Sequence, residues 1–99
     1  MIDPSLIFGF DWDAGNDRKN DKHGVSQSEA EEVFFNQPLL LLEDARHGGQ
    51  EARFHALGKT HEGPRLHIAF TLRQHDTLIR VISARHMHRK ERAIYEQAN

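Results

Sequence analysis

Basic side chains concentrate toward the end of the chain. The stretch from Arg80 to Arg85 has the pattern of a strand, and it runs into a helix that carries Arg89, Lys90 and Arg92. A guanidinium presents a planar fork of hydrogen-bond donors that matches a phosphate. Arginines gathered at one end of a sheet therefore predict a site for a polyanion, confined to one surface of the molecule.

The charge along the chain is consistent with such a surface. The formal net charge of −2 argues against a protein that binds nucleic acid with its whole surface. Residues 1–50 hold 4 Lys/Arg against 10 Asp/Glu, residues 51–92 hold 9 against 4, and residues 93–99 add one Glu, so the segments carry −6, +5 and −1. Two faces of opposite sign are expected, one for a polyanion and one for a basic partner, unless folding mixes the charges.

Composition narrows the class of protein. A chain of 99 residues, 37% hydrophobic and 28% charged, is expected to form a single globular domain over residues 1–99. The absence of cysteine excludes disulfides and thiolate zinc sites. No basic leader and no stretch long enough to span a bilayer is evident, so we expect a cytoplasmic protein with no membrane contact.

The first third of the chain predicts a strand and two helices. Apolar and polar residues alternate from Leu6 to Trp12, as in a half-buried strand. A largely polar helix is expected from Ala14 to His23, ending at Gly24. Ser26 and Glu29 have the spacing of a capping box, which predicts the start of a second helix with an apolar stripe.

The remainder predicts an antiparallel meander. Alternation is clearest where Leu66, Ile68 and Phe70 fall between polar residues, so one sheet face is apolar and the other polar. Ser83 and Arg85 share one face by this parity and Arg80 takes the other, although the register is not fixed by sequence. The expected strands cover residues 39–42, 52–59, 65–73 and 78–85, with a C-terminal helix after residue 88. We thus predict an α+β fold, an antiparallel sheet with the two N-terminal helices on its apolar face and an additional C-terminal helix.

Five short motifs in this order carry a family resemblance. They are Phe10-Asp11-Trp12-Asp13; Asn20 with Lys22-His23-Gly24-Val25; Glu51-x-Arg53; Gly58; and Arg80-Val81-Ile82-Ser83-Ala84-Arg85 followed by Glu91-Arg92 and Tyr95. This combination, spread over nearly the whole chain, resembles the BrnT toxin family. The resemblance implies a compact RelE-like fold and a metal-independent endoribonuclease that cleaves RNA and inhibits translation. It also implies a cognate BrnA-type ribbon-helix-helix antitoxin as partner, with DNA contacted only indirectly through that antitoxin.

A metal-free ribonuclease needs a base for the ribose 2′-hydroxyl, cations for the phosphate and an acid for the departing 5′-oxygen. His23 could be the base or the acid, since imidazole ordinarily titrates near pH 6.5, and Glu51 could be the base or orient an arginine. The catalytic candidates are Lys22, His23, Glu51, Arg53, Arg85 and Tyr95, and the candidates for RNA binding along the polar face are His55, Arg65, His67, Arg73, Arg80 and Ser83. The family usually has Thr or Ser where this chain has His88, a poorer helix cap, so the position of Tyr95 is the less secure.

Structural readings compete with several of these assignments. Lys22-His23-Gly24 also suits a plain helix end, and Glu51 with Arg53 suits a surface ion pair. Ser83 has no triad pattern around it and suits a packed strand position. Trp12 has the parity of the core, which favours burial over base stacking.

The eight histidines raise a metal-site hypothesis, built on His86 and His88 with His67 across the sheet. No HExxH helix or acidic cluster accompanies them, so we expect no metal and no other cofactor. Three functions remain open: a ribonuclease toxin, a non-catalytic adaptor with a basic sheet face, and a metal-dependent hydrolase. The toxin is the preferred hypothesis.

Overall fold

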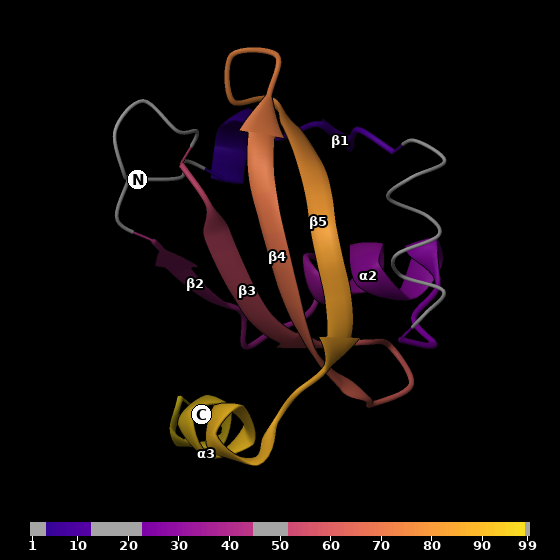
Figure 1. Ribbon diagram of the computed structural model, residues 1–99, viewed down its shortest axis with the longest axis vertical. Helices are drawn as coiled ribbons and strands as arrows, with labels where there is room; N and C mark the ends of the chain where they lie inside the picture. Colours follow the sequence, from indigo (N-terminus) through magenta and orange to yellow (C-terminus); the bar gives the residue numbers. More distant parts are fainter. Residues whose placement is uncertain (1–3, 13–22, 45–51, 99) are drawn as a thin grey trace.

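The computed structural model describes residues 4–12, 23–44 and 52–98, which form an α+β arrangement around one five-stranded sheet (Figure 1). The strand order is β1-β5-β4-β3-β2. The elements are η1 (Pro4–Leu6), β1 (Gly9–Phe10), α2 (Gln27–Val33), β2 (Leu40–Glu43), β3 (Phe54–Lys59), β4 (Arg65–Arg73), β5 (Leu78–His86) and α3 (Arg89–Gln97).

The predicted meander is confirmed, since β2, β3, β4 and β5 pair as antiparallel neighbours. The prediction of a wholly antiparallel sheet is wrong, because β1 runs parallel to β5 and makes the sheet mixed. The N-terminal strand is also shorter than expected and covers only Gly9–Phe10, after a 3₁₀ turn. Just after it, the indole of Trp12 donates a hydrogen bond of 2.8 Å to Glu31 of α2.

The helix α2 begins as its capping box predicts. The hydroxyl of Ser26 accepts from the backbone N–H of Glu29, and the carboxylate of Glu29 accepts from the N–H of Ser26. Its buried residues, Ala30 and Val33, pack against the apolar face of the sheet. The other expected N-terminal helix, over residues 14–23, lies outside the described residues except for His23.

The second helix of the described chain, α3, packs on the opposite face of the sheet from α2 (Figure 1). Tyr95 and Met87 contact Leu57 of β3 and Leu40 of β2 there. Of the predicted pair of N-terminal helices only α2 lies within the described residues, so the predicted arrangement is confirmed in part: one α-helix precedes the meander and one follows it, on different faces. The C-terminal helix covers part of the face that we expected to be open.

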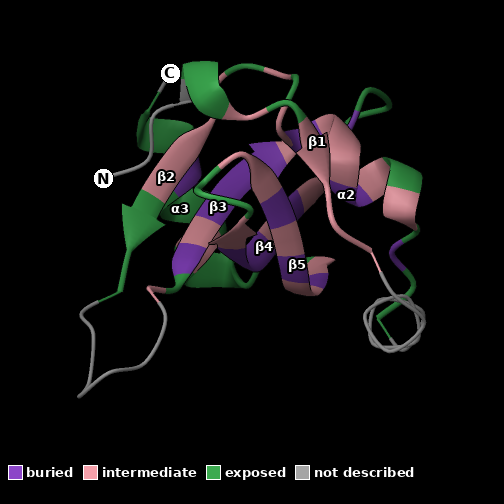
Figure 2. Ribbon diagram, turned by 90° about the horizontal axis from the view of Figure 1, so that it is seen from above, coloured by how far each residue is buried: buried purple, intermediate pink, exposed green. Residues whose placement is uncertain are grey.

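The alternation of β4 is confirmed and sets the two faces of the sheet. Leu66, Ile68 and Phe70 are buried on the side of α2, and bands of buried and half-buried residues alternate along the strands (Figure 2). Phe70 stacks on Phe54 with ring centroids 5.6 Å apart and meets Phe34 edge-on at 5.2 Å. The polar face is thereby held by a rigid aromatic core behind it.

A register shift between β4 and β5 decides which arginines share a face. Ala69 pairs with Ser83, but the next β4 residue, Phe70, pairs with Val81, so Ile82 is an extra residue on β5. The extra residue reverses the alternation, and Arg80 therefore lies on the same face as Ser83 and Arg85. The prediction that Arg80 occupies the opposite face is wrong for this reason.

The helix α2 approaches the sheet closely at Gly58 of β3. A Cβ atom at this position would lie 2.7 Å from Cγ1 of Val33 and 3.2 Å from its carbonyl oxygen. Contacts that short force the helix away from the sheet, because the obstacle includes backbone. Glycine is needed here for space.

We expect Gly58→Ala to lower the free energy of unfolding by about 1–3 kcal/mol, the usual range for overpacking a core. Denaturant titration of this variant, of Val33→Ala and of the double variant measures the coupling. The double variant should lose less than the sum of the single losses, because Val33→Ala removes the methyl group that clashes. Wild-type stability in Gly58→Ala would show that α2 is not packed as described.

Candidate functional site

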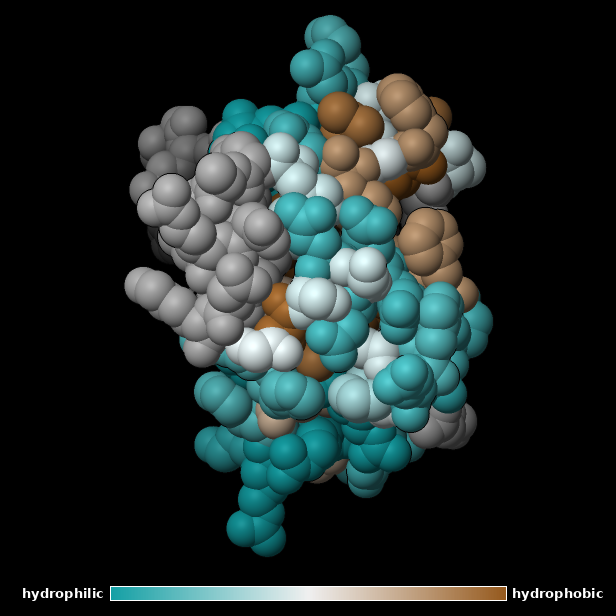
Figure 3. Space-filling model, turned by 90° about the vertical axis from the view of Figure 1, so that its right-hand side faces the viewer, coloured by the Kyte–Doolittle hydropathy of each residue, from teal (hydrophilic) through white to brown (hydrophobic). Residues whose placement is uncertain are grey.

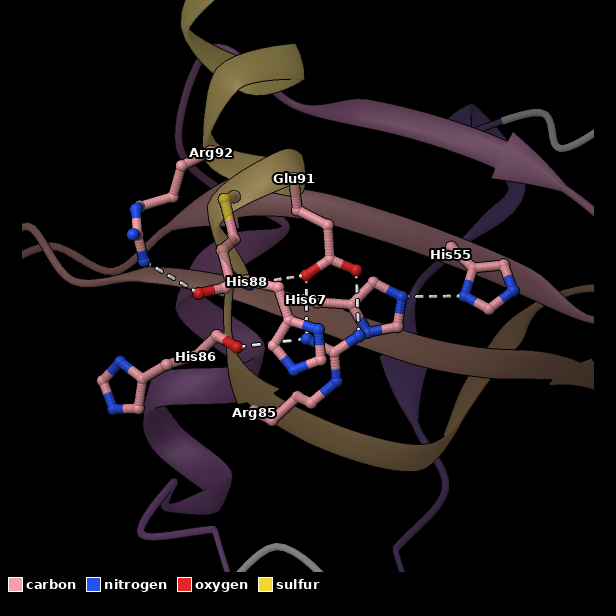
Figure 4. Close-up of polar contacts among 8 residues, drawn as sticks. His55, His67, Arg85, His86, His88, Glu91 and Arg92 are labelled. Carbon is pink, nitrogen blue, oxygen red and sulfur yellow. Dashed lines mark hydrogen bonds and ion pairs between the residues drawn. The ribbon is translucent and has the colours of Figure 1, made fainter.

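Polar side chains from three strands meet on the face of the sheet opposite α2. Across the ladder, His67 of β4 pairs with Arg85 of β5, while His55 of β3 lies opposite Ala69, one step along the same face. The first turn of α3 brings Glu91 over this group (Figure 4). These side chains, with Asp44 at the end of β2, form the polar cluster.

Two histidines and an aspartate form a continuous chain within the polar cluster. Oδ2 of Asp44 lies 2.6 Å from Nε2 of His55, and Nδ1 of His55 lies 2.9 Å from Nε2 of His67. A carboxylate only accepts, so Nε2 of His55 carries a proton. A neutral His55 then accepts from Nε2–H of His67 and leaves Nδ1 of His67 unprotonated. That atom is buried and has no hydrogen-bond partner among the described residues.

His67 is held in its neutral form. Burial lowers the pKa of His67 below its ordinary value of 6.5, and the positive charge of Arg85 lowers it further. The negative charge of Glu91 acts in the opposite direction but does not reverse the shift. A neutral imidazole beside a guanidinium is the form that can accept a proton near neutral pH.

Arg85 is engaged by a carboxylate from α3. Its two terminal nitrogens donate to the two oxygens of Glu91 at 2.8 and 2.9 Å, and Glu91 also accepts from the backbone N–H of His88 at 2.8 Å. The hydrogen bonds from Arg85 are the largest cause that lowers the pKa of Glu91, to about 2, and the bond from His88 lowers it further. Glu91 thus caps α3 in place of the side chain of His88, and the ion pair fastens the helix to β5.

Arg85 therefore differs from the freely exposed phosphate ligand that we expected. Only 25% of its side chain is exposed, and 22% of that of Glu91. A phosphate that binds Arg85 must share the guanidinium with Glu91 or displace it. The bidentate geometry seen with the carboxylate is the one that a phosphate would adopt.

The other predicted cations are spread over the face. Arg65 pairs with Glu96 of α3, and Arg80 pairs with Asp11 at 3.2 Å. Arg73 lies six positions beyond His67 on β4, roughly 20 Å away. Arg53 is exposed, and its carbonyl accepts from the backbone N–H of Asp44 at 2.8 Å, so it lies beside the polar cluster. The expected gathering of arginines is not found among the described residues, because Arg53 lies beside Asp44 at one side of the polar cluster and Arg85 lies beside His67 and Glu91 at the other.

The remaining candidates lie elsewhere. Lys22 and Glu51 are outside the described residues, and His23 is exposed just before α2. Tyr95 is only 2% exposed and donates its hydroxyl to the carbonyl of Pro38 at 2.6 Å, while burial raises its pKa. This geometry favours an anchoring role for Tyr95. Ser83 is half-buried opposite Ala69.

The sequence matches the family model of the ribonuclease toxin BrnT of type II toxin-antitoxin systems over residues 12–91. The chain belongs to the BrnT family. The matched region includes every member of the polar cluster and ends at Glu91. No curated protein matches the sequence significantly. A BrnT-family protein is a ribonuclease toxin with an RNA substrate and an antitoxin partner, which confirms the preferred hypothesis.

The alternative metal site is not found in the described part of this toxin. No group of three or more His, Cys, Asp or Glu side chains there could hold a metal ion. His86 follows Arg85 on β5 and so takes the opposite side of the sheet from His67. No helix among the described residues is long and apolar enough to cross a membrane.

Three features of the site were not predicted from sequence. They are the contact of Asp44 with His55, the pairing of Glu91 with Arg85, and the contact between His55 and His67, which the sequence indicates only as separate RNA-binding residues. The contact between His55 and His67 could have been predicted, because both residues lie on the same face of two neighbouring strands. The spacing of Glu91 from His88, three residues, was the signal of a helix cap.

We expect Glu91→Gln to lower the free energy of unfolding by about 1–3 kcal/mol at pH 7, because it weakens two charge-assisted bonds. The folded-state pKa of about 2 lies below the ordinary 4.5, so the contribution of Glu91 is present above pH 4.5 and is lost as the pH falls toward 2. Denaturant titration at several pH values should show that the difference in the free energy of unfolding between wild type and Glu91→Gln shrinks as the pH falls from 4.5 toward 2.

Glu96→Gln is the matched control for this measurement. Its carboxylate also pairs with an arginine, but 55% of the side chain is exposed, so its removal should change stability by less than about 1 kcal/mol. Equal effects of the two variants at pH 7 would contradict the assigned importance of the Arg85–Glu91 pair.

Proposed function

We propose that this toxin is a metal-independent endoribonuclease whose acid and base are His67 and His55. The observation that carries the proposal is the chain from Asp44 through His55 to His67 on the sheet face that also presents Arg85. It combines a neutral imidazole, a second imidazole in direct contact with it and a guanidinium, which are the groups that cleavage of RNA without a metal requires.

The reaction follows from these groups. The base accepts the proton of the ribose 2′-hydroxyl, whose oxygen attacks the phosphorus and forms a 2′,3′-cyclic phosphate. The bond to the 5′-oxygen breaks, and the acid protonates that oxygen. In this proposal the displacement of Glu91 by RNA also gives the 2′-hydroxyl access to Nδ1 of His67, which is buried without substrate. When Nδ1 takes up the proton, the Nε2 proton of His67 can pass along the hydrogen bond to His55, where Asp44 stabilises the imidazolium. Arg85 neutralises the charge that develops on the phosphate once the substrate takes the place of Glu91.

The remaining candidates complete the proposal. Arg53 is exposed beside the polar cluster and is positioned to bind a neighbouring phosphate. Lys22 stays a proposed ligand of the phosphate and Glu51 a proposed partner of an arginine, whereas this proposal gives the acid and base roles first considered for His23 and Glu51 to His67 and His55. The antitoxin is proposed to be a BrnA-type ribbon-helix-helix protein, and the toxin to act on cytoplasmic RNA.

Cleavage of RNA in the presence of EDTA tests the proposed chemistry. Wild-type toxin should cut and leave 2′,3′-cyclic phosphate and 5′-hydroxyl ends, whereas His67→Ala and His55→Ala should each be about 10²–10⁴-fold slower. The rate should rise with pH through a pKa below 6.5, because protonated His67 is no base, and should fall again at higher pH, where the acid has lost its proton. His75→Ala, in the exposed turn between β4 and β5, is the control and should cut normally.

Other outcomes of that experiment identify the alternatives. Binding without cutting would indicate the non-catalytic adaptor, and activity only with an added divalent metal would indicate a metal-dependent hydrolase. Unchanged cleavage in both histidine variants would remove the polar cluster from the mechanism.

The role of Arg85 is separated from its effect on the helix by comparing Arg85→Gln with Glu91→Gln. Both variants break the same ion pair and loosen α3, so both should lose similar stability. Only Arg85→Gln should lose RNA cleavage, by about 10²-fold or more, because Glu91 is not a ligand of the phosphate. Rates at a temperature where both variants are folded decide the matter, and an equal loss of activity would make Arg85 structural.

A further inference from the structure

The apolar face of the sheet is not completely covered by α2. The helix has seven residues, and beyond its C-terminal end a cavity of about 400 Å³ opens between β1, α2 and the sheet. We call this cavity the apolar groove. Its lining includes Phe8, Phe10, Phe34, Phe35, Leu41 and Glu31. It lies on the opposite side of the sheet from the polar cluster.

Two aromatic side chains of the apolar groove are left in contact with water. Phe8 is 78% exposed and Phe35 is 71% exposed. Figure 3 shows apolar side chains gathered on the surface toward the end of the molecule that holds β1. Aromatic rings exposed together around a hollow are typical of a surface that binds another protein, because removing their apolar surface from water is favourable.

The border of the groove carries negative charge. The helix beside it, α2, contains Glu29, Glu31 and Glu32 and no lysine or arginine. Glu31 lines the groove itself while it accepts the hydrogen bond of Trp12. A second copy of this chain would bring its own acidic helix against this one, which is unfavourable. The complementary occupant combines apolar side chains with lysine or arginine.

We propose that the apolar groove binds the antitoxin, through a segment that inserts apolar side chains between Phe8 and Phe35 and places a basic side chain near Glu31. The proposal rests on the proposed function as a toxin with a cognate partner. Because the groove and the polar cluster lie on opposite faces of the sheet, antitoxin binding and RNA cleavage are separable by mutation. A basic segment of the antitoxin would also match the negative charge of residues 1–50, from which a basic partner is expected.

The test uses the full-length toxin and one defined probe: the small protein encoded by the adjacent reading frame, chosen because its coexpression restores growth. Phe8→Ser combined with Phe35→Ser should weaken binding of this protein at least about 100-fold by calorimetry, the usual effect of removing two central aromatic anchors. The double variant should cut RNA at the wild-type rate and should no longer be neutralised. The affinity of the wild-type toxin for this protein should fall as the salt concentration is raised, because salt screens the attraction between Glu31 and the basic side chain.

Ile94→Ser is the matched control, because Ile94 is also an exposed apolar residue, at 53%, but lies on α3 away from the groove. It should bind the probe normally. Thermal melting confirms that the double variant is folded, and if it is not, the single variant Phe35→Ser is used, with a weaker loss of binding expected.

The proposal is overturned if the folded groove variant binds the probe like the wild type, or if no adjacent product binds the toxin. It is also overturned if light scattering shows the toxin alone to be a dimer that the groove variant converts to a monomer, since the occupant is then a second copy. The two proposals can also fail separately. If the groove variant no longer binds the probe and the wild-type toxin does not cut RNA, the groove is the antitoxin site and the proposed chemistry is wrong.

Discussion

The register between β4 and β5 is the constraint on which the candidate site depends. If β5 paired with β4 without the bulge at Ile82, Arg80 and Arg85 would point to different faces, and the charges of the strand would be divided between core and solvent. With it, the apolar positions Ile79, Val81 and Ala84 all remain buried. A single bulge therefore reconciles a packed core with a polar face, and it places Arg85 opposite His67.

The same contact that organises the site also restrains it. Glu91 holds Arg85 in a bidentate pair, caps α3 and contributes its charge to the surroundings of His67. The carboxylate keeps the guanidinium oriented while no substrate is present, as preorganised sites require. In the proposed mechanism RNA must therefore compete with the carboxylate of Glu91 for Arg85. Stability of the C-terminal helix and availability of the phosphate ligand are consequently opposed.

The two faces of the sheet carry side chains of different chemistry. One face, behind α2, is aromatic and remains partly open at the apolar groove; the other carries histidines, arginines and their carboxylate partners. Within the described residues α2 packs closely on the sheet at Gly58, and the apolar groove lies beyond the C-terminal end of the helix. If RNA binds the polar cluster and the antitoxin binds the apolar groove, as we propose, each of the two ligands meets a surface of complementary chemistry.

Much of the fold follows from local patterns in the sequence. The alternation in β4, the capping box of α2 and the order of the last three strands were all predictable, because each depends on residues close together in the chain. The family was predictable as well, from short motifs in a fixed order. The tertiary structure alone decided that β1 pairs in parallel with β5, that α3 lies on the polar face, and that the sheet carries a bulge at Ile82. It also decided which side chains meet: Asp44 with His55, His55 with His67, and Arg85 with Glu91. These contacts depend on strand register and helix docking, which balance many small packing energies over the whole domain and leave no signature in any single stretch of residues.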